Sequence, residues 1–217
     1  MKYNTFIFDF DFTLVDATAG IMESFNYALN QVGFASESCE KIRKTVGMTL
    51  TNAFFQLTAV SDEQKTELFI SSFKYMADKV MADNTVLFDD SLNVLSRLKK
   101  SGFNTAIVTN KLHYRIDEVL NNYGIVELID YIVGFEDVLN PKPSPEGLLK
   151  AIEHFGNAKQ SALYIGDSLI DANTAANAGV DFAAVTTGTT TKQELLTFQH
   201  ICIANNLTAV MDSINLA

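Results

Sequence analysis

The chain has 217 residues, of which 47% are hydrophobic, and it carries a formal net charge of −10. This composition excludes a disordered chain, and the length suits one globular core with room for an inserted segment. A chain this acidic has no electrostatic reason to bind nucleic acid or an anionic membrane. An anionic substrate would therefore need local positive charge, from a lysine, a helix N-terminus or a metal ion.

The two cysteines, Cys39 and Cys202, lie far apart and form no C-x-x-C pair. They predict neither a zinc site nor a disulfide framework, and we expect buried free thiols. The first apolar run, 6–8, is too short for the core of a signal peptide, and no stretch approaches the ~18 apolar residues of a membrane span. We expect a cytoplasmic protein, either a monomer or a homodimer.

Along the chain, 5–8 is a short apolar run that predicts a strand buried on both faces, as in a parallel sheet. From about 18 to 82 only helical patterns follow, among them one that we expect Ser61 to cap. This block interrupts the alternation of strands and helices. It predicts an inserted cap of three or four helices, with hinges near 16–18 and 83–87.

After the cap, strand and helix patterns alternate to the end of the chain. This alternation predicts a doubly wound α/β fold, in which helices cover both faces of a parallel sheet. Further strands are predicted at 104–108, 131–133, 162–165 and 182–185, and helices at 91–100, 116–123, 145–155 and 172–178.

Two aspartates, Asp9 and Asp11, directly follow the first strand. Strand residues i and i+2 point to the same side, and open α/β sheets place their sites at the carboxyl ends of strands. Since neighbouring carboxylates repel, one favours its protonated form unless a cation intervenes. The pair suits a nucleophile beside a general acid. The alternative is an aspartate-rich loop that caps the next helix.

Thr109 and Asn110 end the strand at 104–108, where a hydroxyl and a helix N-terminus can receive phosphate oxygens. N-capping is the more common role of such a pair. Farther on, all three prolines of the chain surround Lys142 in the run Asn-Pro-Lys-Pro-Ser-Pro at 140–145. Prolines restrict the backbone, so they predict a lysine that is held in one place. The alternative is a solvated lysine in a proline-rich turn.

The strand at 162–165 leads into Gly166 and Asp167, and Asp171 lies four residues farther on. The glycine permits a tight turn from strand to helix, and hard oxygen ligands of this kind suit Mg²⁺. Asp167 is also a candidate helix N-cap, and the two roles are compatible.

These four motifs, in this order, resemble the haloacid dehalogenase superfamily in its phosphatase branch. Similar proteins are phosphoglycolate phosphatases and β-phosphoglucomutase-type proteins with a helical cap. The resemblance covers nearly the whole chain. It implies a Rossmann-like core domain of residues 1–16 and 84–217, with the cap formed by residues 17–83.

The resemblance also implies the roles of the core residues. Asp9 would be the nucleophile and Asp11 the general acid/base in hydrolysis of a small phosphorylated metabolite. Thr109 and Asn110 would bind the transferring phosphoryl group, and Lys142 would neutralise Asp9 and the phosphate oxygens.

The implied cofactor is Mg²⁺. Its ligands would be Asp9, the backbone carbonyl of Asp11, and Asp167, while Asp171 would support the site or pair with Lys142.

The sequence departs from the family pattern at two positions. The usual glycine after the second aspartate is Phe12, and a usual serine is Ala17. Neither change removes a catalytic side chain, so we expect both to affect the substrate rather than the chemistry. Within the cap, Arg43 and Lys44 precede a glycine and are candidate substrate-binding cations. A solvated helix end is the alternative.

Other activities fit the motifs less well. A phosphosugar mutase would use the same residues but return the phosphate to its substrate. A phospho-accepting receiver module also uses aspartates, a hydroxyl and a lysine, but it has no helical insert. In a dehalogenase, Asp11 would have no leaving alkoxide to protonate.

Overall fold

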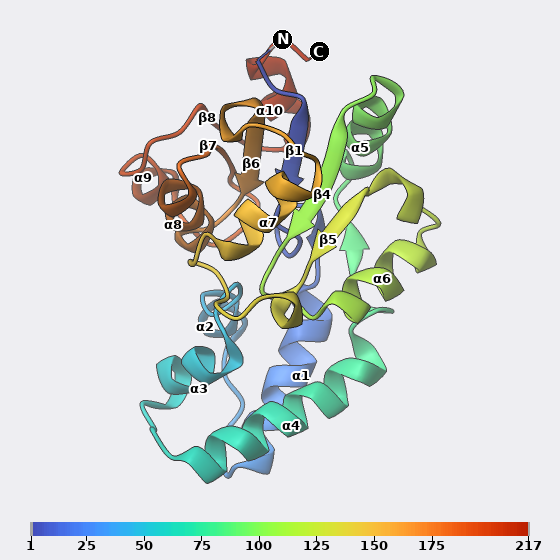
Figure 1. Cartoon of the computed structure of the whole chain (residues 1–217). Coiled ribbons are helices and arrows are strands. Elements are labelled where there is room, and N and C mark those ends of the chain that lie inside the picture. The colour runs from blue at the N-terminus through green and yellow to red at the C-terminus, as the bar shows by residue number, and fades with distance from the viewer. Residues whose placement is uncertain (1, 217) are drawn as a thin grey trace. The chain divides into compact units, whose positions relative to one another are not determined.

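The computed structural model describes residues 2–216, which form two compact units (Figure 1). The core unit comprises the residues up to 16 together with those from 87 onwards, and the helical unit comprises residues 17–86. In this division the helical unit ends at residue 86. Two short strands that were not predicted, β2 (Val15–Asp16) and β3 (Val86–Leu87), mark the two passages of the chain between the units.

The core unit is built on a parallel sheet of six strands in the order β5-β4-β1-β6-β7-β8 (Figure 1). Taken in chain order, the first five strands of this sheet confirm the prediction. The edge strand β8 was not predicted, although residues 201–204 form a short apolar run; its three strand residues are half-buried. The strands are β1 (Thr5–Phe8), β4 (Asn104–Val108), β5 (Tyr131–Val133), β6 (Ala162–Gly166), β7 (Asp181–Val185) and β8 (Cys202–Ala204).

Helices cover both faces of this sheet, which confirms the doubly wound α/β fold. Alternate residues of β1 enter two separate hydrophobic clusters: Phe6 and Phe8 pack with one set of helices, and Ile7 packs with another. The first set is α5 (Ser91–Lys100), α6 (His113–Asn122) and α10 (Leu207–Ser213), and the second includes α7 (Glu146–His154), α8 (Leu169–Ala178) and α9 (Lys192–Leu195). Short 3₁₀ helices lie at Val126–Leu128, Phe135–Asp137 and Lys159–Ser161.

Two predicted helices begin one turn earlier than expected. The apolar patterns placed their starts at 116 and 172, whereas α6 begins at His113 and α8 at Leu169. The first turn of α6 carries polar residues, so its apolar stripe is not yet visible there, whereas α8 begins with Leu169 and Ile170 directly after its cap Ser168. For α8 this matters functionally, because the earlier start puts Asp171 inside the first turn of the helix.

The helical unit contains four helices around its own core, where the sequence predicted three or four. They are α1 (Thr18–Gln31), α2 (Cys39–Arg43), α3 (Leu50–Thr58) and α4 (Glu63–Val80). Phenylalanines hold this core together: the rings of Phe54 and Phe69 stack with centroids 4.9 Å apart. The predicted cap of α4 is wrong, since Asp62 rather than Ser61 accepts from the Lys65 N–H at 2.8 Å.

Both cysteines are free, but Cys39 is exposed at the start of α2 and Cys202 is half-buried in β8. The expectation of two buried thiols is therefore wrong. Among residues 2–216 the structure contains no helix that could span a membrane.

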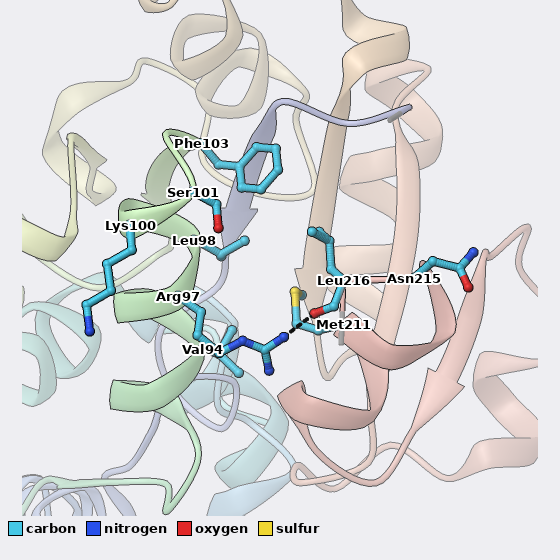
Figure 2. A pocket seen from close by; sticks show the side chains of 9 residues that line it. All are labelled: Val94, Arg97, Leu98, Lys100, Ser101, Phe103, Met211, Asn215 and Leu216. Carbon is cyan, nitrogen blue, oxygen red and sulfur yellow. Dashed lines mark hydrogen bonds between the residues drawn. The ribbon is translucent and has the colours of Figure 1, made fainter.

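A cavity of about 330 Å³ lies between α5 and α10, near the amino end of β4 (Figure 2). Arg97 donates a hydrogen bond across it to the carbonyl oxygen of Leu216. None of the residues predicted to carry chemistry lines this cavity. It is lined by Val94, Arg97, Leu98, Lys100, Ser101, Phe103, Met211, Asn215 and Leu216.

Candidate active site

The carboxyl ends of three neighbouring strands bring the predicted polar residues together. Asp9, Thr109 and Asp167 directly follow β1, β4 and β6, which lie side by side in the order β4-β1-β6. The Asp9 N–H continues the ladder and donates to the Ile165 carbonyl at 2.9 Å. Parallel strands end at the same edge of the sheet, so these side chains share one site.

Three carboxylates and one lysine form the centre of this site. Lys142 Nζ lies 2.8 Å from Asp9 Oδ1 and 2.7 Å from Asp171 Oδ1. One carboxylate oxygen each from Asp9, Asp167 and Asp171 lies within 4.8 Å of the others. The four side chains are buried, so their charges interact with little screening by water.

Three carboxylates face one lysine, so negative charge is in excess at this site, and the pKa values show which carboxylates carry it. Burial and the nearby charge of Asp171 raise the pKa of Asp9 to about 6. Burial and the charges of Asp171 and Asp9 raise the pKa of Asp167 well above its ordinary value. Burial opposes ionisation of Asp171 too, but the Lys142 charge and its hydrogen bonds lower the pKa of Asp171. Asp171 therefore holds Lys142, while Asp9 and Asp167 are carboxylates in need of a further cation.

The sequence analysis placed the main repulsion between Asp9 and Asp11. In the structure, the carboxylate that raises the pKa of Asp9 most strongly is Asp171, which tertiary folding brings to the site. Asp11 has a cation of its own: Lys111 Nζ lies 2.8 Å and 3.1 Å from its two carboxylate oxygens. Lys111 was not among the predicted site residues, although it directly follows Asn110.

The residues fit a divalent metal ion. Asp9 Oδ1 is buried and accepts no hydrogen bond of good geometry, even though it lies close to Lys142. Lys142 also pairs with Asp171, so one lysine faces three buried carboxylates, and such an excess of buried negative charge is costly unless a further cation binds. Hard carboxylate oxygens in a compact group match Mg²⁺ better than softer metals. Asp171 is the weakest candidate ligand of the three, since both of its oxygens already accept hydrogen bonds within the protein.

Two glycines leave room for the carboxylates. A Cβ atom at Gly188 would lie 1.8 Å from Asp167 Oδ2, and one at Gly166 would lie 2.5 Å from the Asp171 side chain. Gly166 was noted in the sequence as a turn residue. Gly188 was not, because its role depends on the loop after β7 approaching the end of β6.

Three further residues hold the lysine in place. The Asn110 side chain accepts from the Lys142 N–H at 2.9 Å and donates to the Lys142 carbonyl at 3.1 Å. Lys142 Nζ donates to the Tyr164 hydroxyl, which lies 2.8 Å from Asp171 Oδ1. Ser168 caps α8 and donates to Asp171 Oδ2. Tyr164 and Ser168 were missed in the sequence, where a tyrosine inside an apolar strand was the one available signal.

The loop after β1 has an unusual backbone. Phe12 has a φ of 63°, in the left-handed region that favours glycine. This is the position at which the sequence departs from the family pattern, so a phenylalanine here adopts a conformation suited to glycine. Nearby, the Thr13 hydroxyl donates to Asp167 Oδ1 at 3.2 Å and so links this loop to the end of β6.

Arg43 and Lys44 belong to the helical unit, at the end of α2. Arg43 donates to the Thr18 hydroxyl at 2.7 Å, and Lys44 pairs with Glu40 one helical turn away at 2.8 Å. Thr109 is buried, and its hydroxyl accepts from the Lys111 N–H at 3.3 Å. The predicted phosphate and substrate contacts of these three residues remain predictions.

Comparison with known proteins places the chain in a family. The family described as haloacid dehalogenase-like hydrolase matches residues 6–185. The pyrophosphatase PpaX of Bacillus cereus is 30% identical over 85% of this chain and 84% of its own length. A crystal structure of a haloacid dehalogenase-like hydrolase from Bacteroides fragilis is 40% identical, with a TM-score of 0.93 over 96% of this chain and 100% of that one.

A second solved structure, of a predicted phosphatase from Clostridium acetobutylicum, is 25% identical, with a TM-score of 0.90 over the full length of both chains. The match to the family spans most of the chain and includes Asp9, Thr109, Lys142 and Asp167. The protein therefore belongs to the haloacid dehalogenase-like hydrolase family.

Proposed function

We propose that this hydrolase is a Mg²⁺-dependent phosphatase that cleaves a small phosphorylated metabolite through a phospho-aspartate formed on Asp9. The observation that carries the proposal is the state of Asp9. Its carboxylate is buried at a strand end, its Oδ1 is without a hydrogen bond, and a fixed lysine lies 2.8 Å away. A nucleophile in such a place is held ready, with the charge needed to receive an anionic phosphate beside it.

In the first half of the reaction, an Asp9 oxygen attacks phosphorus and the bond to the leaving oxygen breaks. Asp11 gives a proton to that oxygen. In the second half, water attacks the phosphorus of the acyl phosphate, Asp11 accepts a proton from the water, and Asp9 is released with inorganic phosphate. Before the reaction Lys142 is charged, because the charges of Asp171 and Asp9 outweigh the effect of burial and raise its pKa.

Asp9 and Asp167 would hold the metal ion, together with the backbone carbonyl of Asp11. When bound, Mg²⁺ supplies the positive charge that lets an anionic carboxylate approach an anionic phosphate. The excess of three clustered carboxylates over one lysine and the raised pKa of Asp167 support this assignment.

The substrate class is proposed from the family members. Phosphoglycolate-like compounds and sugar phosphates follow from the resemblance in the sequence, and the relative in Bacillus cereus adds pyrophosphate. Arg43 and Lys44 are the proposed specificity residues, because a second anionic group on the substrate would need a cation in a strongly acidic protein.

The test is phosphate release from a panel of phosphoglycolate, sugar phosphates, pyrophosphate and p-nitrophenyl phosphate. We expect one metabolite to be preferred, Mg²⁺ to be required, Ca²⁺ to inhibit, and Asp9→Asn to abolish turnover in a folded protein. Isomerisation of a sugar phosphate without release of inorganic phosphate would instead favour the alternative activity, that of a phosphosugar mutase. A tenfold change in rate corresponds to about 1.4 kcal/mol in the activation barrier. If Asp9→Asn turns over within about tenfold of wild type, the assignment of Asp9 as the nucleophile is wrong.

Variants of the helical unit test specificity in the same assay. We expect Arg43→Ala or Lys44→Ala to raise KM for the preferred metabolite by roughly 10- to 100-fold, as for one lost charge-assisted hydrogen bond. The same variant should hardly change KM for p-nitrophenyl phosphate, which lacks a second anionic group. If neither variant distinguishes the two substrates, specificity lies elsewhere.

A further inference from the structure

Lys111 is a buried lysine that the proposed chemistry does not yet use. Its side chain is 7% exposed, and that of its partner Asp11 is 13% exposed. Its Nζ donates to both carboxylate oxygens of Asp11, at 2.8 Å and 3.1 Å. Ordering a long side chain and removing two charges from water are both unfavourable, so a buried pair is weak evidence for stability. The pair therefore calls for a functional explanation.

The backbone of Lys111 is fixed on both sides at the end of β4. Its N–H donates to the Thr109 hydroxyl at 3.3 Å, and its carbonyl accepts from the Phe135 N–H at 2.9 Å. Its Nζ lies 5.7 Å from the centre of the Phe10 ring, which borders the same loop as Asp11. The cation thus approaches Asp11 from the loop after the neighbouring strand β4, independently of the loop that carries Asp11.

Contact with both oxygens restricts how the carboxylate can turn. A carboxylate in contact with one donor still rotates about its terminal bond, whereas one held at both oxygens has a defined plane. Each oxygen has two lone pairs, so one on each remains available for a proton while Lys111 uses the other. The contact is thus compatible with proton transfer by Asp11.

We propose that Lys111 is a positioning residue for Asp11. It fixes the plane of the Asp11 carboxylate, which transfers protons to and from the reacting oxygens. This inference rests on the proposed function. Lys111 then acts through Asp11 and does not contact the phosphoryl group. This distinguishes it from Lys142, which contacts Asp9 directly.

Substitution of Lys111 should lower kcat/KM for some substrates much more than for others. An alkoxide is a poor leaving group and needs a well-placed acid, whereas an activated aryl oxide leaves without one. Lys111→Met keeps the length of the side chain and removes its charge. We expect it to lower kcat/KM for an alkyl phosphate by about 100-fold or more and for dinitrophenyl phosphate by less than about threefold.

Three further variants sharpen the test. Lys111→Arg, which can also reach two oxygens, should keep the alkyl phosphate within about tenfold of wild type. Lys192→Met, a matched change at an exposed lysine, should leave both substrates unchanged. In an Asp11→Asn background, Lys111→Met should lower kcat/KM for the alkyl phosphate by less than about twofold, because residues that act as a unit are not additive.

Each outcome decides the question. Equal losses on both substrates would mean that Lys111 contacts the phosphoryl group, and a further large loss in the Asp11→Asn background would mean that it acts independently of Asp11. Either result, or no loss at all, would overturn the proposal. The comparison in the Asp11→Asn background needs only Asp11→Asn and the double variant to fold, so it stands even where Lys111→Met alone does not. Failure of the proposed function is a separate result: wild type and Lys192→Met would then release no phosphate.

Discussion

Replacing Asp9 with asparagine should stabilise the metal-free protein while it removes the proposed nucleophile. The pKa of Asp9 is raised from 3.8 to about 6, because the carboxylate is buried and lies near the charge of Asp171. Asparagine has the shape of the protonated carboxyl group and never carries the charge. Above about pH 6, the wild-type protein therefore bears an ionisation cost that the variant avoids.

The magnitude follows from the two pKa values. The difference between about 6 and 3.8, at 1.36 kcal/mol for each pKa unit, corresponds to about 3 kcal/mol of folding stability at neutral pH. The new amide must also find an acceptor in the buried cluster, so we expect a net gain of about 1–3 kcal/mol. Asp9 binds its proton more tightly in the folded state than in the unfolded state. Wild-type stability should therefore fall as the pH rises from about 4 to about 6, and level off above that.

Urea unfolding of both proteins, with a chelator present, measures this effect. The advantage of Asp9→Asn that arises from ionisation of Asp9 should be about 2 kcal/mol larger at about pH 7.5 than at about pH 4.5, while titrating groups outside the site affect both proteins alike. Saturating Mg²⁺ should reverse the order, because only the wild type keeps the full ligand set. A variant that is less stable than wild type in chelator at about pH 7.5, or an advantage that does not change with pH, would refute the reasoning.

Two further substitutions test the local geometry of the site. Gly188→Ala should displace Asp167, because the new Cβ would lie 1.8 Å from Asp167 Oδ2. We expect this variant to bind Mg²⁺ about 10- to 100-fold more weakly, as measured by calorimetry. Unchanged affinity would show that the loop carrying residue 188 adjusts. At Phe12, where φ is 63°, Phe12→Gly should unfold at a higher urea concentration than Phe12→Ala, with a difference of about 1 kcal/mol. The opposite order would show that this backbone relaxes once the ring is gone.

The local pattern of the sequence was enough to predict the class of fold and the ends of the central strands. A strand buried on both faces is largely apolar, so 5–8, 104–108 and 162–165 were visible as short, mainly apolar runs. Parallel strands end at a common edge, so the polar residues after those runs could be expected to share one site. The helical insert was visible for a similar reason, since apolar residues with a helical period filled the interval between the first two long strands.

The local pattern of the sequence did not decide how the charges of the site are paired: the resemblance implied the pair of Lys142 and Asp9, and the tertiary structure added the pair of Lys111 and Asp11. Asp9 and Asp11 are neighbours in the sequence, yet Asp9 faces Lys142 and Asp11 faces Lys111. Each lysine comes from a segment about 100 residues or more farther along the chain, and no local pattern encodes such a distance. The same holds for Gly188, whose missing side chain matters only because folding brings its loop against Asp167. Periodicity reports which side of an element is buried, whereas the partner of a buried charge depends on which strands and loops meet.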